Sequence, residues 1–130
     1  FVDYFNKFLE PNRRCYVLVK DDIYLAGTYG ITEIVRGCFE SAYLGYYAFS
    51  GFNAKGYMSI GLKLLLKEIF TTLKLHRIEA NIQPDNLASI LLVKINRFRL
   101  EGYSKSYLQM NGVWKDHERW AMTLEDWESL

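Results

Sequence analysis

The sequence predicts a mixed α/β (α+β) fold, with a mostly antiparallel central sheet that is flanked by helices. An amphipathic helix pattern lies between two strand patterns in the middle of the chain, and such a unit requires one parallel strand pair. Short strand patterns separated by turn residues come before this unit. After it, an Asn-Gly pair joins two further strand patterns, which predicts a hairpin.

The amino-terminal half is expected to be a helix followed by an antiparallel meander. Its first apolar and aromatic residues follow helical spacing at Phe1, Tyr4, Phe5, Phe8 and Leu9. Stretches rich in β-branched and aromatic residues then predict strands over 15–20, 23–31 and 41–49.

The carboxyl-terminal half is expected to form a helix, a strand, a second helix and the hairpin. The spacing of Ile60, Leu64, Leu65, Ile69 and Leu73 predicts one apolar helix face over residues 57–73. Alternation predicts a half-buried strand over 77–82, and capping residues before position 88 predict a helix over 88–95. The hairpin strands are expected over 98–110 and 113–124, with Asn111-Gly112 in a type I′ turn.

The composition argues against several classes of partner. Sixteen Lys and Arg nearly balance fifteen Asp and Glu, so no overall field favours nucleic acid or an anionic membrane. No apolar stretch reaches the roughly 20 residues of a membrane helix, and no secretory signal is evident. Cys15 and Cys38 lack CxxC spacing, so we expect reduced thiols in a cytoplasmic protein. His76 and His117 have no further ligand at metal-site spacing, so no metal is predicted.

Residues 1–130 are expected to be a single domain. The chain has 130 residues, half of them hydrophobic, which suits one domain with one core. It begins with Phe1 rather than Met and within a helical pattern, so we expect that sequence upstream of Phe1 is missing.

A candidate anion site lies between the third expected strand and the strongest helix. A glycine there allows close backbone approach, and the first helical turn offers unpaired N–H groups and a positive dipole end. A pyrophosphate fits such a turn, although on spacing alone an ordinary strand-to-helix turn is the favoured interpretation. The segment comprises Asn53, Ala54, Lys55, Gly56, Tyr57 and Met58.

Three blocks of the sequence resemble the GNAT superfamily of N-acetyltransferases. The run LGYYAFSGFNAKGYMSIGLKLLLKEIF resembles the coenzyme A-binding motif of that superfamily. The runs HRIEANIQPDNLAS and FRLEGYSKSYLQMNGVWKDHERWAM are similar to its ribosomal-protein N-terminal acetyltransferase branch. The resemblance implies the GNAT acyltransferase fold without its first strand, acetyl-coenzyme A (acetyl-CoA) as cosubstrate, and direct transfer to an amine.

The resemblance also implies roles for individual residues. The third strand exposes backbone groups to the pantetheine arm at Tyr46, Tyr47 and Ala48, and the segment from Asn53 to Met58 wraps the pyrophosphate. Asn86 matches an asparagine that contacts the cofactor arm, and Ser89 matches a serine near the thioester sulfur.

Amine acetylation needs a base for the amine and a proton donor for the thiolate. Glu79 is the candidate base, since strand alternation places it opposite the buried Ile78 and Ala80. Ser89 is the candidate to protonate or hydrogen-bond the thiolate. The alternative for Glu79 is a surface carboxylate paired with Arg77 or a lysine, and for Ser89 a helix-start residue bonded to backbone.

Three residues depart from the family pattern. Asn53 replaces a Gln or Arg, Met58 replaces a small residue, and Arg97 replaces a Gly before Phe98. These changes predict altered cofactor affinity, and the loss of Gly at position 97 predicts a different backbone turn there, because such a turn commonly uses a positive φ. They also motivate a second hypothesis, a coenzyme A-binding or interaction module that has lost catalysis.

The branch resemblance favours a protein or peptide N-terminal amine as acceptor, and a small amine is the alternative. Glu33, Glu40 and Glu79 are scattered and form no evident acidic cluster in the sequence. The missing first strand predicts an exposed sheet edge available for contacts in a homodimer. The aromatic residues of the hairpin are interpreted as cross-strand packing: Tyr103, Tyr107, Trp114 and Trp120.

Overall fold

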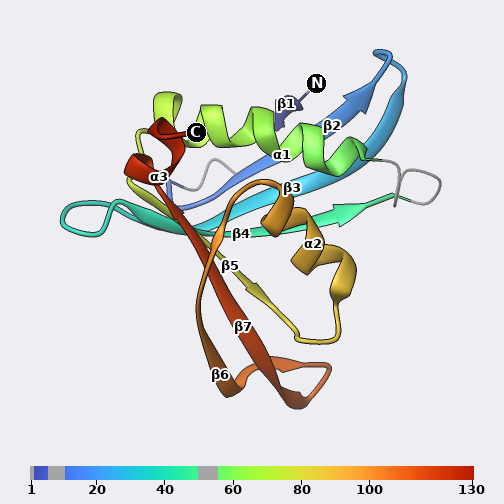
Figure 1. Cartoon of the computed structure of the whole chain (residues 1–130). Coiled ribbons are helices and arrows are strands. Elements are labelled where there is room, and N and C mark those ends of the chain that lie inside the picture. Colours follow the sequence, from blue (N-terminus) through green and yellow to red (C-terminus); the bar gives the residue numbers. More distant parts are fainter. Residues whose placement is uncertain (1, 6–10, 50–55) are drawn as a thin grey trace.

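The computed structural model describes residues 2–5, 11–49 and 56–130 (Figure 1). These residues form a sheet of seven strands, three α-helices and one π-helical turn. The strands are β1 (Val2–Phe5), β2 (Arg14–Lys20), β3 (Tyr24–Val35), β4 (Ser41–Ala48), β5 (Arg77–Ile82), β6 (Arg99–Met110) and β7 (Val113–Thr123). The helical segments are α1 (Tyr57–Lys67), the π-helical turn η1 (Glu68–Thr72), α2 (Leu87–Ile95) and α3 (Leu124–Glu128).

The sheet is mixed and mostly antiparallel, as predicted. Its strand order is β1-β2-β3-β4-β5-β7-β6, and every described pair is antiparallel except β4 with β5. The parallel pair is the one joined by the helical crossover through α1, because parallel neighbours need a connection that returns to the same end. The fold class that the sequence predicts is therefore confirmed.

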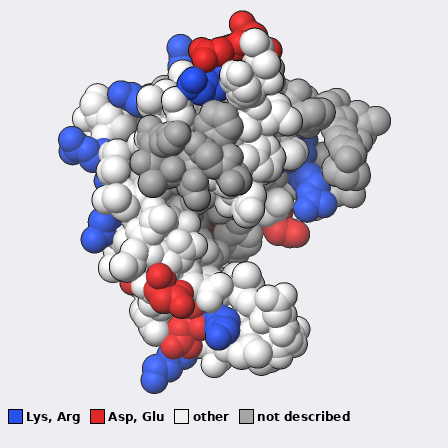
Figure 2. All heavy atoms as spheres, turned by 90° about the vertical axis from the view of Figure 1, so that its right-hand side faces the viewer, with Lys and Arg blue, Asp and Glu red and all other residues white. Residues whose placement is uncertain are grey.

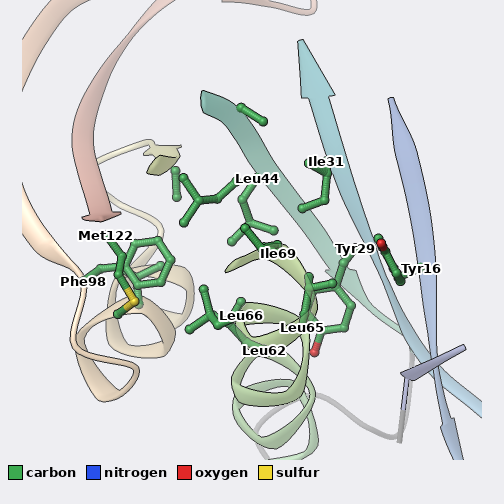
Figure 3. Packing of buried hydrophobic residues seen from close by; sticks show 14 of the residues in the cluster. Tyr16, Tyr29, Ile31, Leu44, Leu62, Leu65, Leu66, Ile69, Phe98 and Met122 are labelled. Carbon is green, nitrogen blue, oxygen red and sulfur yellow. The ribbon is translucent and has the colours of Figure 1, made fainter. Parts of the chain in front are cut away.

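One face of the sheet carries α1 and α2, and we call it the covered face. Alternate residues of β2, β3 and β4 point from this face toward α1, among them Tyr16, Tyr29, Ile31 and Leu44 (Figure 3). The Tyr29 hydroxyl donates a 2.8 Å hydrogen bond to the Met58 carbonyl, which ties β3 to the first turn of α1. The core therefore fixes where α1 begins.

The buried side of α1 and η1 agrees only in part with the predicted one. Leu65, Ile69 and Leu73 are buried as expected, but Ile60 and Leu64 are 60% and 44% exposed. Besides Leu65, α1 buries Met58, Leu62 and Leu66 against the sheet. Because α1 has apolar residues around most of its circumference, spacing alone did not determine which side faces the core.

The prediction of an amino-terminal helix is wrong for Val2–Phe5. These residues form β1 and pair antiparallel with β2, from Val2↔Leu18 to Phe5↔Cys15. Pairing with an open strand edge outweighs a helical spacing signal in so short a stretch. The remaining residues of that pattern lie outside the described part of the chain. Strand β1 is the outermost strand on this side of the sheet, next to β2. The predicted loss of the family's first strand stays a prediction.

The hairpin turn has the expected geometry. Asn111 and Gly112 both have positive φ, 52° and 81°, as a type I′ turn requires. From this turn β6 and β7 run back to the sheet as a long twisted ribbon, which projects beyond the other strands (Figure 1). No described helix is both long and apolar enough to cross a membrane.

Candidate functional site

Strands β4 and β5 pair over three rungs and then part. The paired residues are Ser41↔Arg77, Ala42↔Ile78 and Tyr43↔Glu79, yet β4 continues to Ala48 and β5 to Ile82. We call the last rung, Tyr43 and Glu79, the fork. Beyond the fork, the edge of β4 that faces β5 has no strand partner among the described residues. A ligand with amide groups can pair with such an edge.

Glu79 lies at the fork on the face of the sheet opposite α1 and α2. We call this the open face, because no described helix packs across it. The Glu79 side chain is 24% exposed, and its carboxylate lies 3.0 Å from Nε of Arg77. The alternative interpretation, an ion pair with Arg77, is thus observed. An ion pair and reaction with a substrate are compatible here, since the carboxylate keeps access to solvent.

Arg77 is itself held by a chain of alternating charges. Its guanidinium contacts both carboxylate oxygens of Glu101, and one of these oxygens also accepts from Arg99 at 3.1 Å. Arg99 then reaches Asp126 at 2.7 Å. The hydrogen bonds from Arg77 hold the pKa of Glu101 below its ordinary value. The carboxylate at the fork is therefore anchored to β6 and α3.

The far end of this chain of charges is a capped helix start. Asp126 accepts from the Thr123 backbone N–H at 3.0 Å, and the Thr123 hydroxyl accepts from the Asp126 N–H at 3.1 Å. This reciprocal capping box explains why α3 forms directly after β7. Helix α3 was missed because its capping residues lie inside a pattern that predicts a strand to position 124.

Asn81 follows Glu79 on the open face of β5, beyond the fork. Its Oδ1 is buried and has no hydrogen-bond partner among the described residues. A buried acceptor without a donor costs about 1–3 kcal/mol, so such atoms commonly mark a place for a ligand or water. The sequence offered no signal for this, because asparagine in an alternating strand is ordinary.

The amino end of α1 is free of local caps in the described part of the chain. Gly56, which precedes the helix, has a φ of 80° and forms no side-chain cap, and the first turn holds no acidic residue. No described side chain therefore neutralises the positive end of the helix dipole, which is suited to an anion. Tyr57 and Met58 begin the helix, while Asn53, Ala54 and Lys55 lie outside the described residues.

Met58 points into the core and not into the phosphate turn. It is 8% exposed, and its sulfur lies where a side chain on Gly27 of β3 would be. The long side chain is therefore accommodated by a glycine on the neighbouring strand. The Met58 side chain is therefore used in packing between α1 and β3.

Tyr46 links β4 to α2 beyond the fork. Its hydroxyl donates to the Ser89 carbonyl at 3.2 Å, and burial raises the pKa of Tyr46 to about 12. The Ser89 backbone N–H donates to Oδ1 of Asn86 at 3.2 Å, which caps α2. The Ser89 hydroxyl has no hydrogen bond to a described residue, so it is free for a ligand.

Tyr47 and Ala48 continue β4 to its end. Tyr47 is 65% exposed, since alternation turns it to the open face, away from Tyr46. The next residue, Phe49, donates its backbone N–H to the Ala26 carbonyl at 2.9 Å, so β3 supports β4 to its last residue. The structure thus brings Tyr46, Asn86 and Ser89 together, and places Glu79 across the sheet from them.

The open face is concave beside the fork. Figure 2 shows the molecule hollowed between the projecting hairpin and the body of the chain. Tyr43 of β4 lies at the fork, and its pKa is raised by burial, by Tyr107 of β6 and by the Glu79 carboxylate. Glu33 also acts on Tyr43. Two of the scattered acidic residues, Glu33 and Glu79, therefore share one neighbourhood.

A separate hollow of about 340 Å³ lies between the β5–α2 loop and the hairpin. Its lining includes Pro84, Tyr103 and Trp114. Tyr103 stands in register with Glu118, which pairs with the core residue Ile82, so this hollow is on the covered side. Its lining also includes Asp85, the residue before Asn86, and does not include Glu79.

Comparison with known proteins identifies the family. Residues 1–99 match the acetyltransferase (GNAT) domain. The chain belongs to the GNAT acetyltransferase family. Among curated GNAT relatives, the probable N-acetyltransferase YjcK of Bacillus subtilis is 36% identical over 85% of this chain and 61% of its own length. The [ribosomal protein uS5]-alanine N-acetyltransferase of Escherichia coli is 36% identical over 82% of this chain and 55% of its own length.

Solved GNAT structures agree with the fold. Mycobacterium smegmatis RimJ in complex with CoA-disulfide superposes with a TM-score of 0.82 at 33% identity, over 88% of this chain and 55% of that chain. A spermidine N-acetyltransferase chimera from Vibrio cholerae and hSSAT superposes with a TM-score of 0.85 at 21% identity, over 95% of this chain and 74% of that chain. At that identity the likeness shows the fold alone. The chain thus spans little more than half the length of the curated relatives it matches.

Arg97 keeps the backbone shape at the position where GNAT relatives were expected to have glycine. It has a φ of 69°, its N–H donates to the Lys94 carbonyl, and the Phe98 N–H donates to the Val93 carbonyl. These two bonds form a Schellman motif at the end of α2. The expected change of the turn is therefore wrong, because the surrounding bonds hold the non-glycine residue in the left-handed region.

Proposed function

We propose that this chain is the catalytic domain of a cytoplasmic enzyme that transfers acetyl from acetyl-CoA to a primary amine, most favourably a protein or peptide N-terminal amine. The observation that carries this proposal is the fork, where β4 and β5 separate and Glu79 presents a carboxylate. A thioester arm placed along the free edge of β4 comes within reach of an amine held on the open face.

Features of this chain fit acetyl-CoA. The pyrophosphate suits the uncapped start of α1 at Gly56, and the pantetheine amides suit the free edge of β4 at Tyr46, Tyr47 and Ala48. Asn86 borders the arm, although its Oδ1 is occupied by the α2 cap. Two of the three altered residues do not block this placement, since Met58 is in the core and Arg97 preserves the α2 end, while Asn53 lies outside the described residues. This favours an active enzyme over a module that has lost catalysis.

Glu79 and Ser89 serve the two proton transfers. The acceptor ammonium gives one proton to the Glu79 carboxylate, directly or through water, and the freed lone pair attacks the thioester carbon. The carbon–sulfur bond breaks as the amide bond forms. The second proton from the nitrogen reaches the leaving sulfur, where the Ser89 hydroxyl donates a hydrogen bond. Glu79 then returns its proton to solvent.

The choice of a peptide amine rests on the relatives. One relative is named for acetylating the alanine of ribosomal protein uS5, at 36% identity, whereas the spermidine acetyltransferases are matched at 21–23% and support only the fold. A short peptide with a free N-terminal alanine is therefore the first acceptor to test, with spermidine as the second.

The test combines calorimetric titration of acetyl-CoA with thiol release in the presence of these acceptors. We expect saturable binding, and thiol release that depends on the peptide. Gly56→Val should weaken acetyl-CoA binding at least tenfold, because a β-branched residue resists positive φ at the phosphate turn. Gly37→Val is the matched control, since Gly37 has a φ of 78° in the exposed β3–β4 turn, away from the site.

The outcomes separate the hypotheses. Binding without thiol release from any acceptor would support the module that has lost catalysis. Equal affinity in the two glycine variants would remove the phosphate site from the start of α1.

A further inference from the structure

We propose that Tyr43 contacts the acceptor, that its phenol oxygen receives an N–H of a primary amine opposite Glu79, and that Tyr107 positions this phenol. The inference rests on the proposed acetyl transfer and assigns the amine side of the same site. Tyr43 and Glu79 are partners in the β4–β5 ladder, and residues in register on adjacent strands are about 5 Å apart on one face. At 39% exposure, Tyr43 is open to a ligand.

Tyr107 reaches this region because β6 is bulged. The β6–β7 register shifts between Ser104 and Leu108, and Ser106 has a φ of 47°. The bulge is fixed by Asp116, which accepts from the Ser106 N–H at 2.8 Å and from the Tyr103 hydroxyl at 2.7 Å. A bulge re-aims the side chains of its strand.

The re-aimed Tyr107 ring packs against His117. Their ring centroids are 6.1 Å apart, and His117 is 2% exposed. Packing against a buried ring restricts the position of the Tyr107 side chain. From there Tyr107 lies near enough to Tyr43 to help raise the pKa of Tyr43. The interpretation of Tyr107 as simple cross-strand packing is thus incomplete, because it also bridges the hairpin to the fork.

The chemistry of the group suits a primary amine. Burial, Tyr107 and Glu79 all raise the pKa of Tyr43, so its phenol stays protonated near neutral pH and does not act as the base. A neutral primary amine has two N–H groups and one lone pair. If the lone pair attacks the thioester and one N–H is held by the Tyr43 oxygen, the nitrogen is oriented. A neutral secondary amine has only one N–H group. If its N-methyl group faces Tyr43, that group cannot donate a hydrogen bond to the phenol oxygen.

The test compares two peptides, one with a free N-terminal alanine and one with N-methylalanine at the same position. For Tyr43→Phe we expect a roughly tenfold higher KM for the free peptide, the size of one hydrogen bond to a charged or reacting group, and a smaller preference over the methylated peptide. Acetyl-CoA affinity should not change. Tyr107→Phe should also raise the KM of the free peptide and reduce the preference over the methylated peptide, each by a smaller factor than Tyr43→Phe.

Tyr24→Phe is the matched control, because Tyr24 is a 53% exposed tyrosine at the start of β3, paired with Lys20 and away from the fork and the β6 bulge, so this variant should leave both quantities unchanged. Calorimetric titration of the free peptide onto the coenzyme A complex gives a readout without turnover, and should show the same loss for Tyr43→Phe.

This inference would be overturned if the parent enzyme is active and the folded Tyr43→Phe and Tyr107→Phe variants keep its KM, its peptide affinity and its preference for the free peptide. The proposed function would then still stand. A parent protein that binds acetyl-CoA but acetylates neither peptide nor spermidine would overturn both.

Discussion

The two faces of the sheet are built for different purposes. On the covered face, apolar side chains from the sheet and α1 fill the core, and the polar atoms present are paired, as with Tyr29 and the Met58 carbonyl. On the open face beside the fork, ionisable residues are partly buried, and the orphaned Oδ1 of Asn81 lies among them. Burying polar groups costs free energy unless a partner compensates. The open face accepts that cost where a substrate is expected.

Two tyrosines of β4 show the same contrast. Tyr46 faces α2, and its hydroxyl is committed to the Ser89 carbonyl. Tyr43, three residues earlier, faces the fork and the hairpin. Both have a raised pKa, with burial as the main cause. The same residue type thus fastens the fold on one face and is available to an acceptor on the other.

The largest expected effect separates catalysis from ion pairing on the open face. Glu79→Gln should lower turnover by about 10²–10⁴-fold, the usual contribution of a general base, with little change in acetyl-CoA affinity. Glu101→Gln is the matched variant, because Glu101 is the other carboxylate that binds Arg77. If Glu79 only balances the charge of Arg77, the two variants should lose similar activity. Single-turnover acetylation of the alanine peptide measures both.

The second effect concerns the covered face at alkaline pH. Tyr46 has a folded pKa of about 12, above the unfolded value near 10, so the folded state retains this proton longer. The resulting stability is present below pH 10 and is lost as pH rises toward 12, by about 2 kcal/mol. Tyr46→Phe should make this alkaline decline of the unfolding free energy shallower, as measured by urea denaturation across pH.

The buried Tyr29, whose pKa burial also raises, remains in this variant, so part of the decline should persist. Tyr47→Phe, at the 65% exposed position next to Tyr46, serves as the comparison. An alkaline decline of equal size in both variants would show that Tyr46 does not hold its proton in the folded state.

The local elements could largely be predicted from the sequence, whereas the arrangement of the site could not. Strand β5 was predicted with its observed bounds, because its alternation is unbroken and its flanks hold turn residues. The bulge at Ser106 has no local sequence signature, so the position of Tyr107 near Tyr43 could not be predicted. The grouping of Glu33 with Glu79 likewise depends on strand order and not on spacing.

The family resemblance supplied the candidate site residues, and the structure adds how they are held. Ser89 and Glu79 remain predictions as catalytic residues. The sequence did not indicate that Glu79 is connected through Arg77 and Glu101 to the capped helix α3, because those contacts join three separate segments. Long-range ion pairs of this kind arise only once the register of β5, β7 and β6 is known.

The smallest expected effect tests whether the end of α2 is structural alone. Arg97 occupies the left-handed region at a φ of 69°, where a residue with a Cβ pays about 1 kcal/mol relative to glycine. Arg97→Gly should therefore raise the unfolding free energy by about 1 kcal/mol, while Lys94→Gly, inside the same helix, should lower it by a similar amount. Urea denaturation measures both. Neither change removes an atom from the fork, so acetyl-CoA affinity should stay the same. A loss of affinity in Arg97→Gly without a loss of stability would instead place the Arg97 guanidinium at the cofactor, so that the end of α2 would contribute to the proposed site as its start does through Asn86 and Ser89.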